Sequence, residues 1–257
     1  MFIDTHAHMD DKVFDQDREE LILGLPSRGV SRVICPGIDI DTTQKCVSLS
    51  KEYDIIYAGI GIHPHEAGKV KANYLDDLRE MAKTEKVVAV GEIGLDYYYD
   101  FCPKDVQKKV FIEQIELAAE LGLPIIVHNR EAHKDVMDTL REKKDLIKGG
   151  VMHSYSGSWE TAKIAMNLGF YISLGGPVTF KNARRPVEIA EKMPLDRLLI
   201  ETDSPCLTPH PHRGKRNDPG FVALVAERIA ELKKMDAQEI GRITSENASK
   251  LFNIPLN

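Results

Sequence analysis

The chain has 257 residues, 42% of them hydrophobic and 29% charged, which is ordinary for a globular protein and excludes a disordered, collagen-like or disulfide-scaffold protein. Its formal net charge of -6 argues against a protein that coats nucleic acid by bulk electrostatics, but it is compatible with a local phosphate site. None of the 4 Cys forms a C-x-x-C pair, and we expect their thiols to be reduced. The sequence shows no export signal, so we expect a cytoplasmic location. It contains no 18-residue apolar run, so we expect no membrane association.

Short apolar, β-branched runs recur along the chain with helical patterns between them. This alternation is typical of βα units and of a mainly parallel sheet. The sequence predicts eight strands, which cover Phe2–His6, Arg32–Pro36, Ile55–Ile62, Val87–Ile93, Pro124–His128, Gly150–Ser154, Phe170–Leu174 and Arg197–Thr202.

The segments between these runs carry helix signals. Apolar residues repeat at helical spacing over Pro103–Leu121, and Gly122 stands where that helix is expected to end. We expect other helices to be capped at their amino-terminal ends by Asp41, Ser158 and Asp218. Two more helices are predicted after the last strand, over Gly220–Lys234 and Asp236–Phe252.

Eight strands, each followed by a helix, are the number that closes a (β/α)8 barrel, a fold of about 250 residues. A doubly wound nucleotide-binding sheet is the alternative, and it normally shows a glycine fingerprint at an early βα turn. The first predicted strand instead leads into Asp4-Thr-His-Ala-His8, and Gly59-Ile-Gly61 lacks the third glycine. We therefore predict an α/β protein, a (β/α)8 TIM barrel that forms a single domain over residues 1–257.

Histidines and acidic residues gather past the carboxyl ends of the predicted strands, where barrel enzymes build their active sites. At the end of the first strand, His6 and His8 are two residues apart and should face the same side. The candidate metal ligands at these positions are His6, His8, His63, His65, Glu92, His128, His153, Glu201 and Asp203.

Four imidazoles and two carboxylates are too many for one catalytic zinc, which uses three protein ligands, and they suit two divalent ions. The ligand types are compatible with Mg²⁺, Mn²⁺, Zn²⁺ or Ni²⁺ and do not choose among them. Two such ions about 3.5–4 Å apart can bind the attacking and leaving oxygens and activate a water, so the pattern predicts a hydrolase.

The motifs at the strand ends resemble, in order and over nearly the whole chain, the signatures of the TatD-type metal-dependent deoxyribonucleases. They are Asp4-Thr-His-Ala-His8, Gly61-Ile-His-Pro-His65, Gly91-Glu-Ile-Gly-Leu-Asp96, Val127-His128, His153-Ser-Tyr-Ser-Gly157 and Glu201-Thr-Asp-Ser-Pro205. The resemblance implies a barrel of the metallo-dependent hydrolase superfamily, with 3′-to-5′ exonuclease activity on DNA and sometimes on RNA. It also implies one ion bound by His6, His8, Glu92 and Asp203, with Glu92 bridging to a second ion held by His128 and His153.

The two carboxylates of this set are predicted to be catalytic. Val87–Ile93 contains no Lys that could be carboxylated to bridge two metals, so Glu92 is its only ionisable group and the expected bridge. We expect Asp203 to bind metal and to accept a proton from the nucleophilic water. Glu201 should then orient a ligand imidazole or a water, unless it is a structural hydrogen-bond acceptor at the barrel floor.

Contacts with the substrate are predicted from histidines and from local basic charge. His65 should contact a substrate phosphate or support a metal ligand, and His63 is expected to support the turn around Pro64. In the loop after the last strand, Arg213, Lys215 and Arg216 are expected to bind phosphate, the alternative being that they are solvated surface charges.

Three consecutive tyrosines, Tyr97, Tyr98 and Tyr99, come shortly after Glu92. Such rings can stack on unpaired bases, but tyrosine-rich loops also simply pack, and the sequence alone favours packing.

We therefore predict a two-metal deoxyribonuclease that acts on DNA ends and possibly on RNA, with nucleic acid as its substrate and no stable protein partner. The alternative enzyme would use the same site on a carboxylic ester or amide, such as a lactone, a cyclic amide or an aminoacyl ester of tRNA. A non-catalytic scaffold is disfavoured because all six expected ligands are present.

Overall fold

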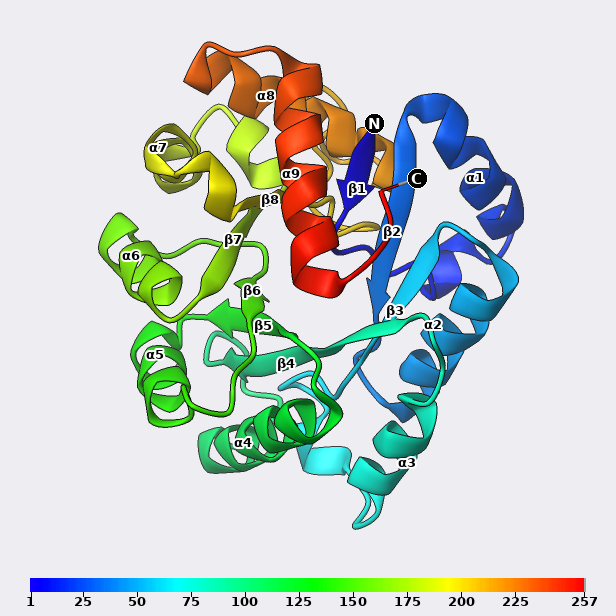
Figure 1. Ribbon diagram of the computed structural model, residues 1–257, viewed down its shortest axis with the longest axis vertical. Coiled ribbons are helices and arrows are strands. Elements are labelled where there is room, and N and C mark those ends of the chain that lie inside the picture. Colours follow the sequence, from blue (N-terminus) through cyan, green and yellow to red (C-terminus); the bar gives the residue numbers. More distant parts are fainter. Residues whose placement is uncertain (257) are drawn as a thin grey trace.

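The computed structural model describes residues 1–256, and its eight strands form one parallel sheet that curls into a nearly closed barrel (Figure 1). The strands follow one another around the sheet in chain order, as the sequence predicts for a (β/α)8 TIM barrel, so the predicted fold is confirmed. The strands are β1 (Phe2–Asp4), β2 (Val30–Pro36), β3 (Ile56–Ile60), β4 (Val87–Asp96), β5 (Ile125–Arg130), β6 (Gly150–Met152), β7 (Phe170–Leu174) and β8 (Leu198–Ile200).

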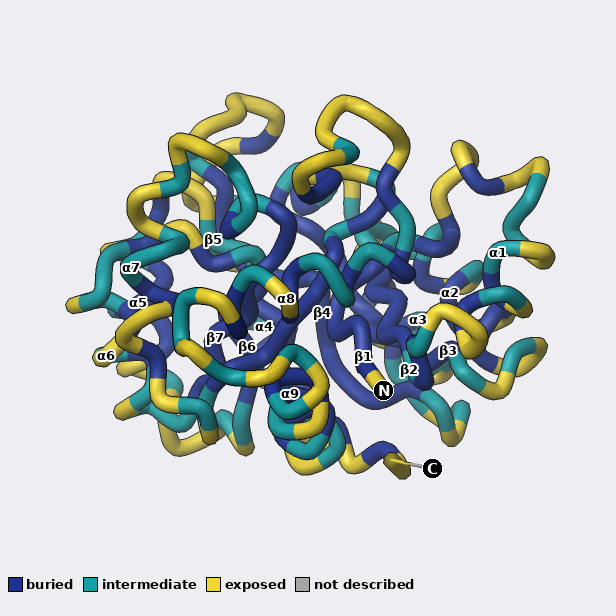
Figure 2. The backbone as a smooth tube through the Cα atoms, turned by 90° about the horizontal axis from the view of Figure 1, so that it is seen from above, coloured by how far each residue is buried: buried dark blue, intermediate teal, exposed yellow. Residues whose placement is uncertain are grey.

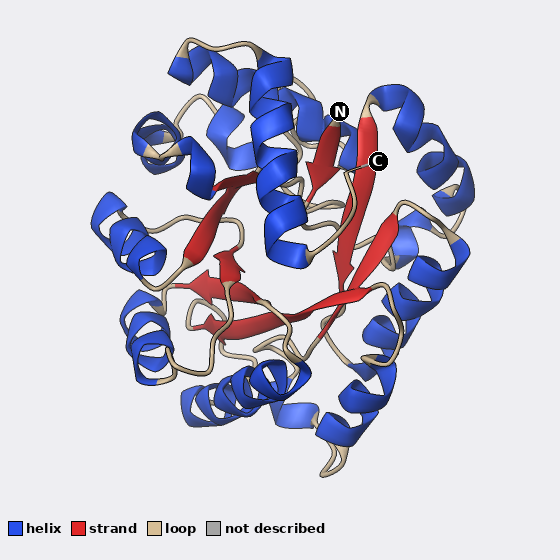
Figure 3. Ribbon diagram, in the orientation of Figure 1, coloured by secondary structure: helices blue, strands red, loops and turns tan. Residues whose placement is uncertain are grey.

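Helices surround the sheet and separate it from solvent (Figure 3). Within residues 1–256, no helix combines the length and the apolar character that a membrane crossing requires. The helices are α1 (Arg18–Gly24), α2 (Ile40–Glu52), α3 (Tyr74–Met81), α4 (Lys104–Leu121), α5 (His133–Glu142), α6 (Trp159–Asn167), α7 (Arg184–Lys192), α8 (Val222–Lys233) and α9 (Ala237–Phe252).

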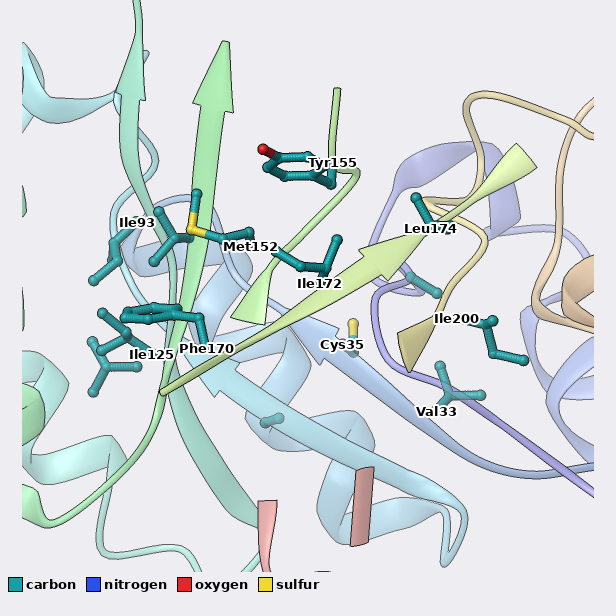
Figure 4. Packing of buried hydrophobic residues seen from close by; sticks show 14 of the residues in the cluster. Val33, Cys35, Ile93, Ile125, Met152, Tyr155, Phe170, Ile172, Leu174 and Ile200 are labelled. Carbon is teal, nitrogen blue, oxygen red and sulfur yellow. The ribbon is translucent and has the colours of Figure 1, made fainter. Parts of the chain in front are cut away.

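The strands are buried on both faces, which explains their continuous apolar sequences. Side chains on the outer face of the sheet, such as Ile125, Met152 and Ile172, belong to a large cluster that packs under the helices (Figure 4). Neighbours such as Ile126 and Val151 belong to a second cluster inside the barrel. Exposed residues lie mainly on the outer helices and the loops, while the strands are buried except toward the end of β5, where Arg130 is exposed (Figure 2).

One end of the barrel is covered by α9, which lies in front of the strands in Figure 1. Ala248 and Phe252 of this helix pack on the inward-facing cluster, and the Asn247 amide donates to the carbonyl oxygens of Leu195 and Leu198 at the start of β8. Because α9 packs against Phe2, the first residue of β1, and bonds to Leu198, the first residue of β8, it closes the amino-terminal end of the barrel. The open end is therefore the one where the strands finish.

The first and last strands meet just past their ends. The Thr5 amide donates to Ile200 O at 3.2 Å, and Ala7 forms a bridge with Ser204. The buried Asp4 carboxylate accepts hydrogen bonds from the backbone N of Thr202 at 3.0 Å and from its hydroxyl at 2.5 Å. These contacts hold the residues after β1 against those after β8.

Local expectations about helix ends are mostly confirmed. Gly122 ends α4 with a φ of 73°, a conformation that glycine adopts freely, and Ser158 caps α6. Asp218 caps the short 3₁₀ turn that leads into α8. The expectation for Asp41 is wrong: Asp39 caps α2, because its side chain and that of Thr42 form a reciprocal capping box.

Candidate active site

The six predicted metal ligands come together at the carboxyl end of the barrel, around the side chain of Glu92 on β4. Glu92 Oε1 lies 2.8 Å from His128 Nδ1 and 2.8 Å from His153 Nε2. Glu92 Oε2 lies 3.4 Å from His6 Nε2 and 3.5 Å from His8 Nε2. Each oxygen of this buried carboxylate therefore faces a different pair of imidazoles.

Asp203 joins the side of the cluster that contains His6 and His8. Its Oδ1 lies 3.7 Å from His6 Nε2 and 3.8 Å from His8 Nε2. Asp203 lies beyond the end of β8 with a φ of 56°, so the alternation of side chains along a strand does not determine its direction. Its backbone N donates to His6 O at 2.9 Å, and this contact between the segments that follow β1 and β8 helps to hold Asp203 in the left-handed conformation.

The donor atoms fit divalent cations. His6 Nε2 and His8 Nε2 are 3.2 Å apart, and His128 Nδ1 and His153 Nε2 are 3.3 Å apart. Lone pairs on ring nitrogens that face each other this closely repel unless a proton or a cation lies between them. His6, His8 and Asp203 could thus hold one cation together with Glu92 Oε2. His128 and His153 could hold another together with Glu92 Oε1.

The pKa values of the two carboxyl groups depend on burial and on the imidazoles around them. Burial alone would raise the pKa of Glu92, but the imidazoles of His153, His63 and His6 outweigh it and keep that pKa well below its ordinary value. Burial raises the pKa of Asp203 despite the nearby imidazoles of His6 and His153. Glu92 is therefore ionised, as a carboxylate that binds a cation must be.

Glu201 contacts His153 on the side of the imidazole that faces away from Glu92. Its Oε1 accepts a hydrogen bond from the Ser154 amide at 2.7 Å and lies 3.3 Å from His153 Nδ1, the nitrogen that faces away from Glu92. Glu201 is fully buried, and burial would raise its pKa, but His153 lowers it below its ordinary value. This contact can fix the orientation and the tautomer of the imidazole.

Asp96 also belongs to the cluster, although the sequence analysis does not predict it as a site residue. Its Oδ2 accepts hydrogen bonds from His128 Nε2 at 3.1 Å and from His65 Nε2 at 2.9 Å, while its Oδ1 accepts from the backbone N of Tyr98 and Tyr99. Burial would raise the pKa of Asp96, but the hydrogen bond from His128 and the amide of Tyr99 bring it far below its usual range. Asp96 thus supports His128 as Glu201 supports His153.

The sequence contained a signal for Asp96. Residues 92, 94 and 96 alternate onto one side of a strand, and β4 continues through Asp96 instead of ending at Ile93. A longer predicted strand would have placed Asp96 beside Glu92.

His63 and His65 are both close to the cluster. His63 Nε2 is 3.6 Å from Glu92 Oε1, and His63 Nδ1 accepts a hydrogen bond from the His65 amide at 3.1 Å. Burial lowers the pKa of His63 well below its ordinary value, so this ring is a neutral candidate ligand next to His128. The contact of His65 with Asp96 is compatible with a supporting role, and its contact with a substrate phosphate stays a prediction.

The residues of the predicted basic loop do not line the cavities beside the cluster. Arg216 forms a bidentate ion pair with Asp17 at 2.8 and 2.6 Å, which ties the last loop to the region before α1. Arg213 lies over the ring of Phe180 at 4.2 Å. Phosphate binding by Arg213, Lys215 and Arg216 therefore stays a prediction, and Arg216 would have to leave Asp17 to take part.

Two cavities flank the metal-ligand cluster. The larger, of about 630 Å³, reaches from His8 and Glu92 to Lys12 and Lys45. These two lysines are not among the substrate contacts predicted from the sequence. The smaller, of about 310 Å³, extends toward Asn129 and Ser154. Both are lined by His128, His153 and Asp203, so a substrate could extend to either side of the cluster.

Comparison with known proteins gives matches over the whole barrel. A family model described as TatD related DNase matches residues 3–253. YabD of Bacillus subtilis, described as an uncharacterized metal-dependent hydrolase, is 51% identical over 254 residues that cover 99% of this chain and 100% of that protein. YcfH of Escherichia coli K12, with the same description, is 39% identical over 255 residues, covering 98% and 96%. The crystal structure of YjjV, a TatD homologue from Escherichia coli K12, has a TM-score of 0.93 at 34% identity and covers 99% and 98% of the two chains.

Proposed function

The chain belongs to the family of TatD-related DNases, which are metal-dependent hydrolases, and from this premise we propose that it uses two divalent ions to hydrolyse phosphodiesters at DNA ends. The proposed direction of digestion is 3′ to 5′, and RNA is a further proposed substrate. The observation that carries the proposal is the position of Glu92, whose two oxygens face two separate pairs of imidazoles at 2.8 to 3.5 Å.

In this proposal, each residue of the cluster has a distinct task. His6, His8 and Asp203 would hold one ion, His128 and His153 would hold the other, and Glu92 would be a ligand shared by the two. The bound ions would supply Lewis-acid stabilisation of the charge that develops on the phosphoryl and leaving oxygens.

Proton transfer is assigned to Asp203. Its carboxylate stands at the edge of the cluster and lines both cavities, so it can reach a water placed between them. Glu201 and Asp96 hold the imidazoles of His153 and His128 in place and keep their free nitrogens directed at Glu92.

The substrate is inferred from the family and from the charge around the larger cavity. Glu92 and Asp203 would repel a phosphodiester in the absence of cations, so bound ions are required for binding as well as for chemistry. Lys12 and Lys45 line the same cavity, and Lys45 is held by Asp10 O and Asp15. Lys12 is therefore the better placed of the two to contact a phosphate.

The direct test is hydrolysis by the manganese-loaded protein of end-labelled single-stranded DNA, RNA of the same sequence, and a panel of lactones, cyclic amides and aminoacyl esters. Shortening of DNA from its 3′ end, lost in Asp203→Asn, is the expected result. Asp145→Asn is the matched control, because Asp145 is an exposed aspartate on the turn after α5. Turnover of an ester or amide with no cleavage of either nucleic acid would reject the proposal.

A further inference from the structure

Three exposed aromatic rings lie side by side in the loop that follows β4. Tyr98 is 59% exposed, Tyr99 39% and Phe101 66%. Every other aromatic ring of the phenylalanines, tyrosines and tryptophan in residues 1–256 is buried or partly buried. Water contact with such large apolar surface is unfavourable, so an exposed cluster of this kind is a common mark of a binding site.

The three rings are arranged in contact with one another. Tyr99 and Phe101 are stacked, with ring centroids 5.2 Å apart and an angle of 9° between their planes, and Tyr98 meets Tyr99 edge to face at 4.8 Å. The guanidinium of Arg130, from the end of β5, lies 4.1 Å from the ring centroid of Tyr98 and 4.9 Å from that of Tyr99. We call Tyr98, Tyr99, Phe101 and Arg130 the aromatic platform.

Tyr97, the first tyrosine of the run, has a different role. Its hydroxyl donates to Asp135 Oδ2 at 2.8 Å, and its ring packs under Lys104. Packing, which the sequence favours for the whole run, therefore holds for Tyr97. The rings of the two tyrosines that follow are exposed to solvent.

The aromatic platform is continuous with the metal-ligand cluster. The His65 ring meets Phe101 edge to face at 4.8 Å and Tyr99 at 5.4 Å, and His65 also lines the larger cavity. The centroids of His65 and His128 are 6.3 Å apart. A chain of nucleotides with one phosphodiester at the cluster would thus bring its adjacent nucleotides over the platform.

Asp96 ties the platform and the cluster together. One of its oxygens accepts the amides of Tyr98 and Tyr99 at 2.9 and 3.1 Å, and the other accepts from His128 and His65. The position of the exposed rings is therefore fixed with respect to a metal ligand by a single buried carboxylate.

Resting on the proposed function, we propose that the aromatic platform is the site where unpaired bases next to the scissile phosphodiester stack. Every base has a flat π face, so rings of this kind bind bases without sequence preference, and the guanidinium adds attraction for the phosphate backbone. In a duplex the faces of the bases are stacked on their neighbours and are not available. We favour a nucleic acid over a protein partner because the platform adjoins the cluster at which the proposed substrate is a nucleic acid.

The test compares an oligothymidylate with an abasic deoxyribose-phosphate oligomer of the same length. Binding is measured by fluorescence anisotropy with manganese-loaded protein carrying Asp203→Asn, so that both oligomers stay intact. That protein should bind the oligothymidylate about 10-fold more tightly than the abasic oligomer for each stacked base. Adding Tyr98→Ala and Phe101→Ala should bring the two affinities to within about twofold, and Tyr98→Phe should keep the preference.

The control is Leu146→Ala, which removes an exposed apolar side chain, 40% exposed, on the turn after α5 and should leave the preference at its starting value. The proposal is overturned if the starting protein binds both oligomers equally, if the double alanine variant keeps the preference, or if a blunt duplex competes as well as the single strand. Because binding is measured without turnover, these results are independent of whether the protein cleaves nucleic acid. Absence of cleavage by the wild-type protein would count against the proposed function alone.

Discussion

Replacing Asp96 by asparagine should weaken metal binding although Asp96 is not expected to touch a metal. A carboxylate only accepts hydrogen bonds, so its contacts at 3.1 Å with His128 and 2.9 Å with His65 require a proton on the Nε2 of each ring. With Nε2 held protonated by Asp96, Nδ1, which lies 2.8 Å from Glu92, is the nitrogen of His128 that can give up its proton and bind a cation.

The asparagine would keep one oxygen for the amides of Tyr98 and Tyr99 and would place its NH₂ group against the two ring nitrogens. Two donors then face each other, and His128 can relieve this only by moving its proton to Nδ1, where it blocks the metal. Loss of a hydrogen bond to a charged group costs about 1.5–3 kcal/mol. That cost corresponds to a decrease of about 10- to 100-fold in metal affinity, which is the usual range for residues that support metal ligands.

Isothermal titration of the metal-free protein with Mn²⁺ or Zn²⁺ measures this affinity directly, and circular dichroism confirms that the barrel is folded. Asp145→Asn makes the same chemical change at an exposed position and should bind metal as the wild type does. An affinity of Asp96→Asn within about twofold of wild type would show that Asp96 does not set the tautomer of His128.

The other predictions concern the base, the barrel closure and the cations. Asp203→Asn should lower the rate of hydrolysis by about 10²–10⁴-fold at saturating metal, and full recovery with added metal would show that Asp203 is a ligand only. Asp4→Ala removes the acceptor for two donors of Thr202 and for the His6 amide, so thermal unfolding should show a loss of about 3 kcal/mol, or about 6–12 °C in Tm. A Tm within about 2 °C of wild type would contradict this role. Lys12→Ala should flatten the salt dependence of KM for DNA more than Arg216→Ala does, because Arg216 is paired with Asp17, and the reverse order would restore the basic loop as the phosphate site.

Much of the fold and of the metal-ligand cluster can be predicted from the sequence because both depend on local patterns. The strands are buried on both faces and therefore appear as apolar runs, and a barrel brings the carboxyl ends of all its strands together. Residues as distant as His6 and Asp203 are thus expected to meet without any information about packing.

What could not be predicted depends on contacts between distant segments. The ion pair of Arg216 with Asp17 joins residues 199 positions apart, and no spacing rule relates them. In the tyrosine run, Tyr97 and Tyr98 differ because Asp135 is within reach of one hydroxyl only. Asp39 and Asp41 are equally good capping residues by type, and the reciprocal contact with Thr42 decides between them.

The number of ions bound per chain is the measurement that tests the central claim most directly. Elemental analysis of protein dialysed against excess Mn²⁺ should give a ratio near two for the wild type and for Asp145→Asn. Glu92→Ala removes the carboxylate that faces both imidazole pairs, so its ratio should fall to about one or below while the barrel stays folded. A wild-type ratio of one or less, or a Glu92→Ala protein that keeps two ions, would contradict the account.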